Sequence, residues 1–154
     1  DDWGIASPSS LRAYWKAFQF VRRIVRREKI ERIHCGRLLP EGWLAMWLKK
    51  LYGIPFVCYV HGEDANPENC GDSDGVLSSR QLRLMTRMVV NNAQCIVANS
   101  RNSARIMTQH WGMLPERVRL LHPGVDTNYF TPTARDEAVR TQLGWHDRPL
   151  LITA

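Results

Sequence analysis

Residues 56–64 read Phe-Val-Cys-Tyr-Val-His-Gly-Glu-Asp, an apolar run that ends in an imidazole and two carboxylates. Residues 56–60 are apolar throughout, which is typical of a strand buried in a parallel sheet. Ligands of open α/β sheets bind at the carboxyl ends of the strands. His61, Glu63 and Asp64 are therefore candidate site residues, because they follow the strand at that edge and can hold protons near neutral pH. Gly62 would let a ligand approach the backbone.

Other short apolar runs also predict strands, at 32–36, 94–98, 118–121 and 149–153. Helical spacing of apolar residues predicts helices at about 11–29, 43–52, 80–91, 101–111 and 137–143. Strands and helices alternate about four times, which predicts an α/β fold: a parallel sheet with helices on both faces. The polar stretch from about 64 to 79 predicts a loop long enough to bind a ligand.

The candidate residues also have structural interpretations. Glu63 and Asp64 would cap the loop by accepting backbone N–H bonds. Ser100 is predicted to cap the helix that follows it, although a helix N-terminus at the ligand edge can also receive an anion. Gly124, in the turn before Asp126, is expected to supply a positive φ.

The net charge of +6 over 154 residues favours anionic partners. Five cations crowd the end of the helical segment 11–32, where they are either a solvated face of a core-packed helix or a surface that touches anionic lipid. Nucleic acid is the weakest option, because these cations lack interleaved exposed aromatic residues. The cysteines lack C-x-x-C spacing and fit a reducing cytosol, so we expect a cytoplasmic protein, peripheral at the inner face of the membrane.

Several chemistries lack their sequence signature. G-x-G-x-x-G after a strand, G-x-x-x-x-G-K-[ST] and H-E-x-x-H are missing from the chain. The spacing G-x-S-x-G occurs at 71–75, but within the predicted polar loop rather than directly after a strand, so no nucleophile elbow is predicted. His61, Glu63 and Asp64 could be metal ligands, but a triplet this compact rarely closes around one ion. We therefore predict neither a metal nor a cofactor.

Three motifs in order resemble the glycogen-synthase-like family 4 of retaining glycosyltransferases. They are His61-Gly62-Glu63-Asp64, the run 93–100, and the run 118–126 with Phe130 and Pro132 after it; the similarity extends from about residue 33 to 154. The resemblance implies the GT-B architecture, in which two Rossmann-like domains face each other across a cleft. Residues 1–130 would be part of the N-terminal, acceptor-side domain, and 131–154 the linker and the start of the donor-binding domain.

The resemblance also implies roles for individual residues. His61 would be the catalytic-site residue that reaches the donor sugar, and Gly62, Glu63, Asp64 and Ser100 would bind substrate. Gly124 and Asp126 would line or shape the cleft near the hinge. The expected reaction moves a hexosyl group from a nucleotide sugar to a glycan or lipid-linked acceptor, as in cell-envelope polysaccharide synthesis.

Nearly all of the donor domain of such enzymes has no counterpart in the chain, which we therefore interpret as a fragment that is inactive alone. Two other classes stay open. One is another GT-B enzyme such as a nucleotide-sugar epimerase, and the other is a non-catalytic module that binds a sugar or a partner.

Overall fold

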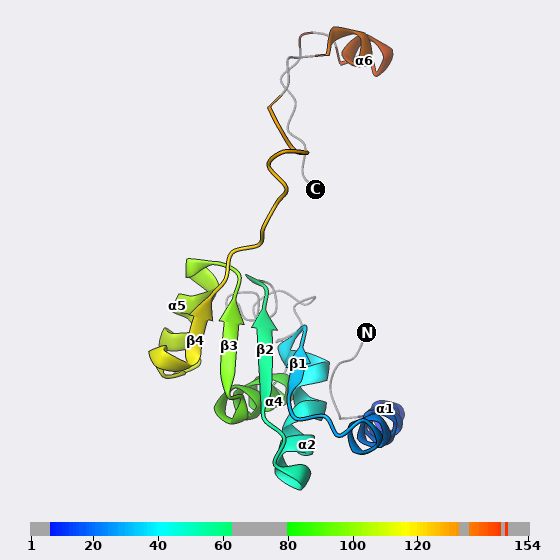
Figure 1. The fold of residues 1–154 in the computed structure, drawn as a ribbon, viewed down its shortest axis with the longest axis vertical. Coiled ribbons are helices and arrows are strands. Elements are labelled where there is room, and N and C mark those ends of the chain that lie inside the picture. Colours follow the sequence, from blue (N-terminus) through cyan, green and yellow to red (C-terminus); the bar gives the residue numbers. More distant parts are fainter. Residues whose placement is uncertain (1–6, 63–79, 133–135, 146, 148–154) are drawn as a thin grey trace. The chain divides into compact units, whose positions relative to one another are not determined.

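A computed structural model describes residues 7–62, 80–132, 136–145 and 147. Helices and strands alternate along the first part of the chain (Figure 1). They are α1 (Pro8–Arg27), β1 (Ile33–Cys35), the helical turn η1 (Leu38–Gly42), α2 (Trp43–Tyr52), β2 (Phe56–Val60), α4 (Arg80–Asn92), β3 (Cys95–Ala98), α5 (Arg101–Gln109), the turn η3 (Pro115–Arg117), β4 (Val118–Leu120) and α6 (Glu137–Gln142). Within these residues, none of the helices has both the length and the apolar character needed to cross a bilayer.

The strands form one parallel sheet in the order β1-β2-β3-β4. Cys58 of β2 pairs with Cys35 of β1 on one side and with Ile96 of β3 on the other, and Ile96 pairs with Val118 of β4. Side chains alternate between the two faces along a strand, so these paired residues share one face. That face is the apolar one, and the predicted parallel sheet with helices is confirmed.

The main core lies on this face. Phe56, Cys58 and Val60 of β2 are fully buried there, as is Ile96 of β3. They pack in one cluster with side chains from three helices, among them Met46 of α2, Met85 and Val89 of α4, and Met107 of α5. Burial of this apolar surface stabilises the sheet by about 25 cal/mol for each Å² removed from water.

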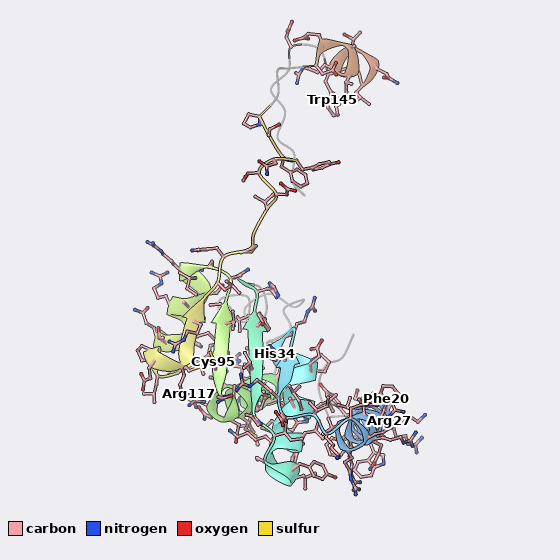
Figure 2. The ribbon with its side chains drawn as sticks, viewed as in Figure 1. Phe20, Arg27, His34, Cys95, Arg117 and Trp145 are labelled. Atoms are coloured by element: carbon pink, nitrogen blue, oxygen red, sulfur yellow. The ribbon has the colours of Figure 1, made fainter. Side chains whose placement is uncertain are left out.

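The strand order explains why α2, α4 and α5 pack on the same face. Each connection from β1 to β4 moves one strand in the same direction, and right-handed crossovers then place every connecting helix on one side. The opposite face carries His34, Tyr59, Cys95 and Arg119 around an open hollow of about 400 Å³. His34 of β1 and Cys95 of β3 are labelled in Figure 2. In the described part of the chain, helices thus pack on one face of the sheet, whereas the sequence predicted helices on both faces.

Helix α1 joins the fold through a second, smaller cluster. Phe18 and Val25 of α1 pack against Leu48 of α2, beside the edge strand β1. The Arg22 guanidinium also donates a hydrogen bond to the Tyr52 hydroxyl at the end of α2. One side of α1 is therefore held by α2, and the rest of the helix is exposed.

Several helix ends follow from the sequence. Gly53, Gly112 and Gly144 have left-handed backbones with φ of 72°, 70° and 68°. Each follows a helix, where glycine is favoured because it has no Cβ to clash in this conformation. The expected short helix near 137–143 is present as α6, whose N-cap Asp136 accepts a hydrogen bond from the Val139 amide. The strand expected at 149–153 lies outside the described residues.

The chain divides into two compact units, Asp1–Pro123 and Gly124–Ala154. The first contains the whole sheet and both apolar clusters. The second contains α6 and the segment that precedes it. The assignment of residues 131–154 to the start of a donor-binding domain stays a prediction.

Candidate functional site

The carboxyl ends of all four strands lie at one edge of the sheet, at the top of the arrows in Figure 1. Backbone hydrogen bonds extend the ladder beyond the strands. The Asn99 amide donates to the Val60 carbonyl at 3.4 Å, and the Leu121 amide donates to the Ala98 carbonyl at 2.9 Å. The segments that leave β2, β3 and β4 are therefore held side by side at this edge.

His61 is the first residue beyond β2 and is exposed. The residue before it, Val60, is fully buried, so the imidazole stands at the boundary between core and solvent. A Cβ added to Gly62 would meet no atom within 4 Å in the described part of the chain. Packing there does not require a glycine, and its predicted role in ligand approach stays a prediction. Glu63 and Asp64 lie outside the described residues.

Ser100 follows β3 and begins α5. Its Oγ accepts a hydrogen bond from the Ser103 amide at 3.1 Å and lies 3.0 Å from the Ser103 hydroxyl. The Ser103 hydroxyl in turn donates to the Asn99 side-chain carbonyl at 3.0 Å. Ser103 is buried, so this network fixes the position of the α5 N-terminus at the carboxyl edge. The predicted helix cap is confirmed.

Asp126 and Gly124 belong to the second unit. One carboxylate oxygen of Asp126 accepts hydrogen bonds from the Asn128 and Tyr129 amides at 2.9 and 3.2 Å. The carboxylate thus caps a turn of its own segment. The expectation of a positive φ at Gly124 is wrong, because among the described glycines only Gly53, Gly112 and Gly144, which follow helices, have a left-handed backbone. Its neighbour Pro123 restricts its own φ without demanding a left-handed residue after it.

The sequence analysis gave no site role to two residues at the same edge. Arg37 follows β1, and His122 follows β4; both are exposed. The signal that singles out His61 also applies to them, because each lies two residues beyond the end of a strand. A cation and a second imidazole are therefore added to the candidate site.

These residues can now be placed in a family. The model of Glycosyltransferase Family 4 matches residues 2–129. The chain belongs to glycosyltransferase family 4. The match begins well before residue 33, where the resemblance starts, and so includes α1; it ends at residue 129 within the second unit.

Several relatives are named D-inositol 3-phosphate glycosyltransferase. The one from Gordonia bronchialis is 31% identical over 113 residues, which is 73% of this chain and 24% of the relative. The one from Thermobispora bispora is 34% identical over 104 residues, which is 67% of this chain and 23% of the relative. This family 4 chain therefore spans about a quarter of the relatives that it matches.

Solved structures support the same fold. A crystal structure of the Anabaena protein HepE in complex with UDP has a TM-score of 0.59 at 20% identity, and covers 85% of this chain and 32% of HepE. HepE in complex with UDP-glucose gives a TM-score of 0.60 over the same shares. The fold of this family 4 chain is thus the Rossmann-like fold of one part of HepE.

The buried cysteines of this family 4 chain are core residues rather than nucleophiles. A hydrogen bond with Cys35, together with burial, raises the pKa of the Cys58 thiol far above its ordinary range. A thiolate is the reactive form of cysteine, so this thiol is inert. Among the residues that the structure describes, no three His, Cys, Asp or Glu side chains gather as a metal site.

Proposed function

We propose that the complete protein is a retaining hexosyltransferase that uses a nucleotide sugar, and that this chain supplies its acceptor-side half. Membership of family 4 supports the reaction class. The HepE structures hold UDP and UDP-glucose, which supports a uridine-diphosphate sugar as donor. Because the chain spans about a quarter of its relatives, the donor-binding half is assigned to the rest of the protein, and the activity to the complete protein.

The carboxyl edge of the sheet carries this proposal. It brings an exposed imidazole, the N-terminus of α5 and the turn after β4 to neighbouring strands. Retaining transfer requires stabilisation of an oxocarbenium-like sugar and of the departing diphosphate. Fixed dipoles meet such charges without reorganising when the reaction occurs. Because its neighbour Val60 is locked in the core, His61 is suited to orient the donor sugar by a hydrogen bond.

The N-terminus of α5 suits the acceptor. A helix N-terminus carries a partial positive charge, and the exposed Arg101 adds a full one. The name of the relatives specifies an acceptor with a phosphate group. We assign this end of α5 and Ser100 to an anionic group of the acceptor, and Gly62, Glu63 and Asp64 to its hydroxyl groups.

Gly124 and Asp126 have an indirect role in this proposal. The Asp126 carboxylate is already engaged by two amides, so it shapes the segment that leads to the donor side. The proposal includes no metal ion or cofactor. It places the enzyme in the cytoplasm, where the cationic helix α1 meets the anionic inner face of the membrane and the acceptor is a glycan or a lipid-linked precursor of the cell envelope.

The reaction class is tested by incubating the complete protein with UDP-glucose and an acceptor, either D-inositol 3-phosphate or a lipid-linked glycan precursor, and following the product by proton NMR. We expect a glucoside with the anomeric configuration of the donor and the same rate with EDTA present. A product of inverted configuration contradicts retention, and loss of the rate in EDTA contradicts the metal-free site. Conversion of the donor to its epimer without an acceptor product would support the epimerase instead.

A further inference from the structure

An apolar groove of about 350 Å³ separates α1 from α2. Phe18 and Trp43 form its floor, where they are 9% and 8% exposed. Its upper walls are open to water: Trp15 is 63% exposed, Leu51 59% and Trp47 40%. An open apolar groove of this kind, rimmed by polar groups, marks a binding surface.

Both helices that form this groove carry cations. Helix α1 has Arg12, Lys16, Arg22, Arg23, Arg26 and Arg27, and neither α1 nor α2 has an acidic residue. Helical spacing places Arg12 and Arg22, three residues before and seven after Trp15, on the same side of α1 as this indole. On α2, the Lys50 ammonium lies 5.0 Å from the centre of the Trp47 ring. Each wall therefore combines an exposed indole with a cation.

The aromatic side chains also correct an expectation from the sequence. Exposed aromatic residues were expected to be missing among these cations, and that expectation is wrong. Trp15 and Phe20 are each 63% exposed on α1. Indole rings beside cationic side chains are the composition found at the boundary between the headgroups and the acyl chains of a bilayer.

Charge complementarity selects the occupant. A second copy of the chain docked through the same surface would bring two acid-free cationic helices together, which is repulsive. An anionic bilayer offers apolar chains for the groove and phosphates for its rim. We propose that the groove between α1 and α2 receives an acyl chain of an anionic phospholipid, whose phosphate is bound by the cations of α1. This inference deepens the membrane contact proposed for α1, and it is independent of sugar transfer.

Vesicles with bromine atoms on their acyl chains test the depth of this contact, because bromine quenches only nearby tryptophan fluorescence. Three of the six tryptophans of the chain line the groove. With vesicles that contain about one-third phosphatidylglycerol, we expect binding together with strong quenching. Phosphatidylcholine vesicles should bind at least tenfold more weakly, because each cation near an anionic surface adds about fivefold. Binding without quenching would overturn the proposal that the groove receives an acyl chain, but not the membrane contact of α1. Absence of binding would overturn both proposals.

Matched substitutions distinguish binding through the groove from non-specific binding through any exposed apolar side chain. Trp15→Ser and Leu51→Gln should each lower vesicle partitioning about tenfold or more, because each removes a large apolar side chain from the contact. Phe20→Ser on the same helix and Leu84→Gln on α4 remove side chains that are 63% and 60% exposed, and should change partitioning less than threefold. Equal losses in all four variants would overturn the proposal. Thermal melts by circular dichroism check that each variant is folded.

Two further measurements address the other occupants. Sedimentation velocity without lipid should show a monomer for the chain and for Trp15→Ser; a dimer lost in that variant would assign the groove to a second copy. Single-stranded DNA should not compete with vesicles in 0.15 M salt. Displacement of the vesicles by DNA, with the same dependence on Trp15, would assign the surface to nucleic acid. Unchanged sugar transfer by Trp15→Ser in detergent-free assays with a water-soluble acceptor would confirm that the two proposals are separate.

Discussion

The side chains at the carboxyl edge differ in how much of their role the sequence reveals. His61 could be placed at the edge from its position after an apolar strand, and the structure places it there. The same rule applied to Arg37 and His122 would have found them too. The cap formed by the Asp126 carboxylate was not predictable, because it depends on the conformation of a segment without helical or strand periodicity.

Ser100 has a structural role that can be measured apart from any contact with substrate. Ser100→Ala removes the acceptor for the Ser103 amide and breaks the contact with the Ser103 hydroxyl. We expect the free energy of unfolding to fall by about 1 kcal/mol, the usual value of a helix N-cap. Urea denaturation measures this change. Ser100→Asp is the control, because aspartate also caps helices and should keep most of the stability; an equal loss in both variants would contradict the capping role.

The buried Cys58 thiol predicts a dependence of stability on pH. Hydrogen bonding to Cys35 and burial raise its pKa in the folded protein. The folded state therefore keeps a proton that the unfolded chain loses above about pH 8.5. Stability from this group is complete below that pH and declines as the pH rises, by up to about 1.4 kcal/mol per pH unit.

Urea denaturation between pH 7 and pH 10 tests this slope. Cys58→Ala should lower stability at every pH but show a shallower decline above pH 8.5 than the unmodified chain. Cys95→Ala leaves Cys58 in place and should keep the steeper decline. Identical slopes in all three proteins would contradict a buried, protonated Cys58.

At the scale of the elements, the apolar runs predicted the strands well because burial in a parallel sheet requires continuous apolar sequence. The side on which the helices pack depends instead on strand order, which the sequence does not show. Once the order β1-β2-β3-β4 is known, right-handed crossovers place α2, α4 and α5 together. The opposite face is therefore left open. On it, His34 Nδ1 lies 3.2 Å from the Tyr59 hydroxyl.

Among the described glycines, Gly42 has the tightest surroundings, at the junction of η1 with α4 and β2. A Cβ on Gly42 would lie 2.8 Å from Val89 Cγ1 and 3.0 Å from Cys58 Sγ. Both neighbours are fully buried and have little room to move. Gly42→Ala should therefore lower the free energy of unfolding by about 1–3 kcal/mol through overpacking.

Chemical denaturation of Gly42→Ala and Gly36→Ala provides a matched comparison. A Cβ on Gly36, one residue beyond β1, would meet no described atom within 4 Å. That substitution should change stability by less than about 0.5 kcal/mol. Similar stabilities for the two variants would show that η1 does not pack as described.

At the scale of the molecule, the resemblance found in three short motifs agrees with a family match over residues 2–129. The motifs were sufficient for the fold because they occupy consecutive strands of one sheet. The motifs did not predict the groove between α1 and α2, because this groove depends on how two amphipathic helices pack rather than on either helix alone. Its exposed indoles look like core residues in the sequence, because helical spacing places Trp15 beside the apolar stripe of α1.

The central claim is that the carboxyl edge of this sheet works in sugar transfer, and the turnover of His61→Ala tests it most directly. The comparison variant is His34→Ala, which removes an exposed imidazole from the open face of the same sheet. In the complete protein, His61→Ala should lower kcat about 100-fold or more, the scale of losing one preorganised polar contact. His34→Ala should stay within about threefold of the unmodified enzyme. Near-normal kcat in folded His61→Ala would contradict the assignment of the site.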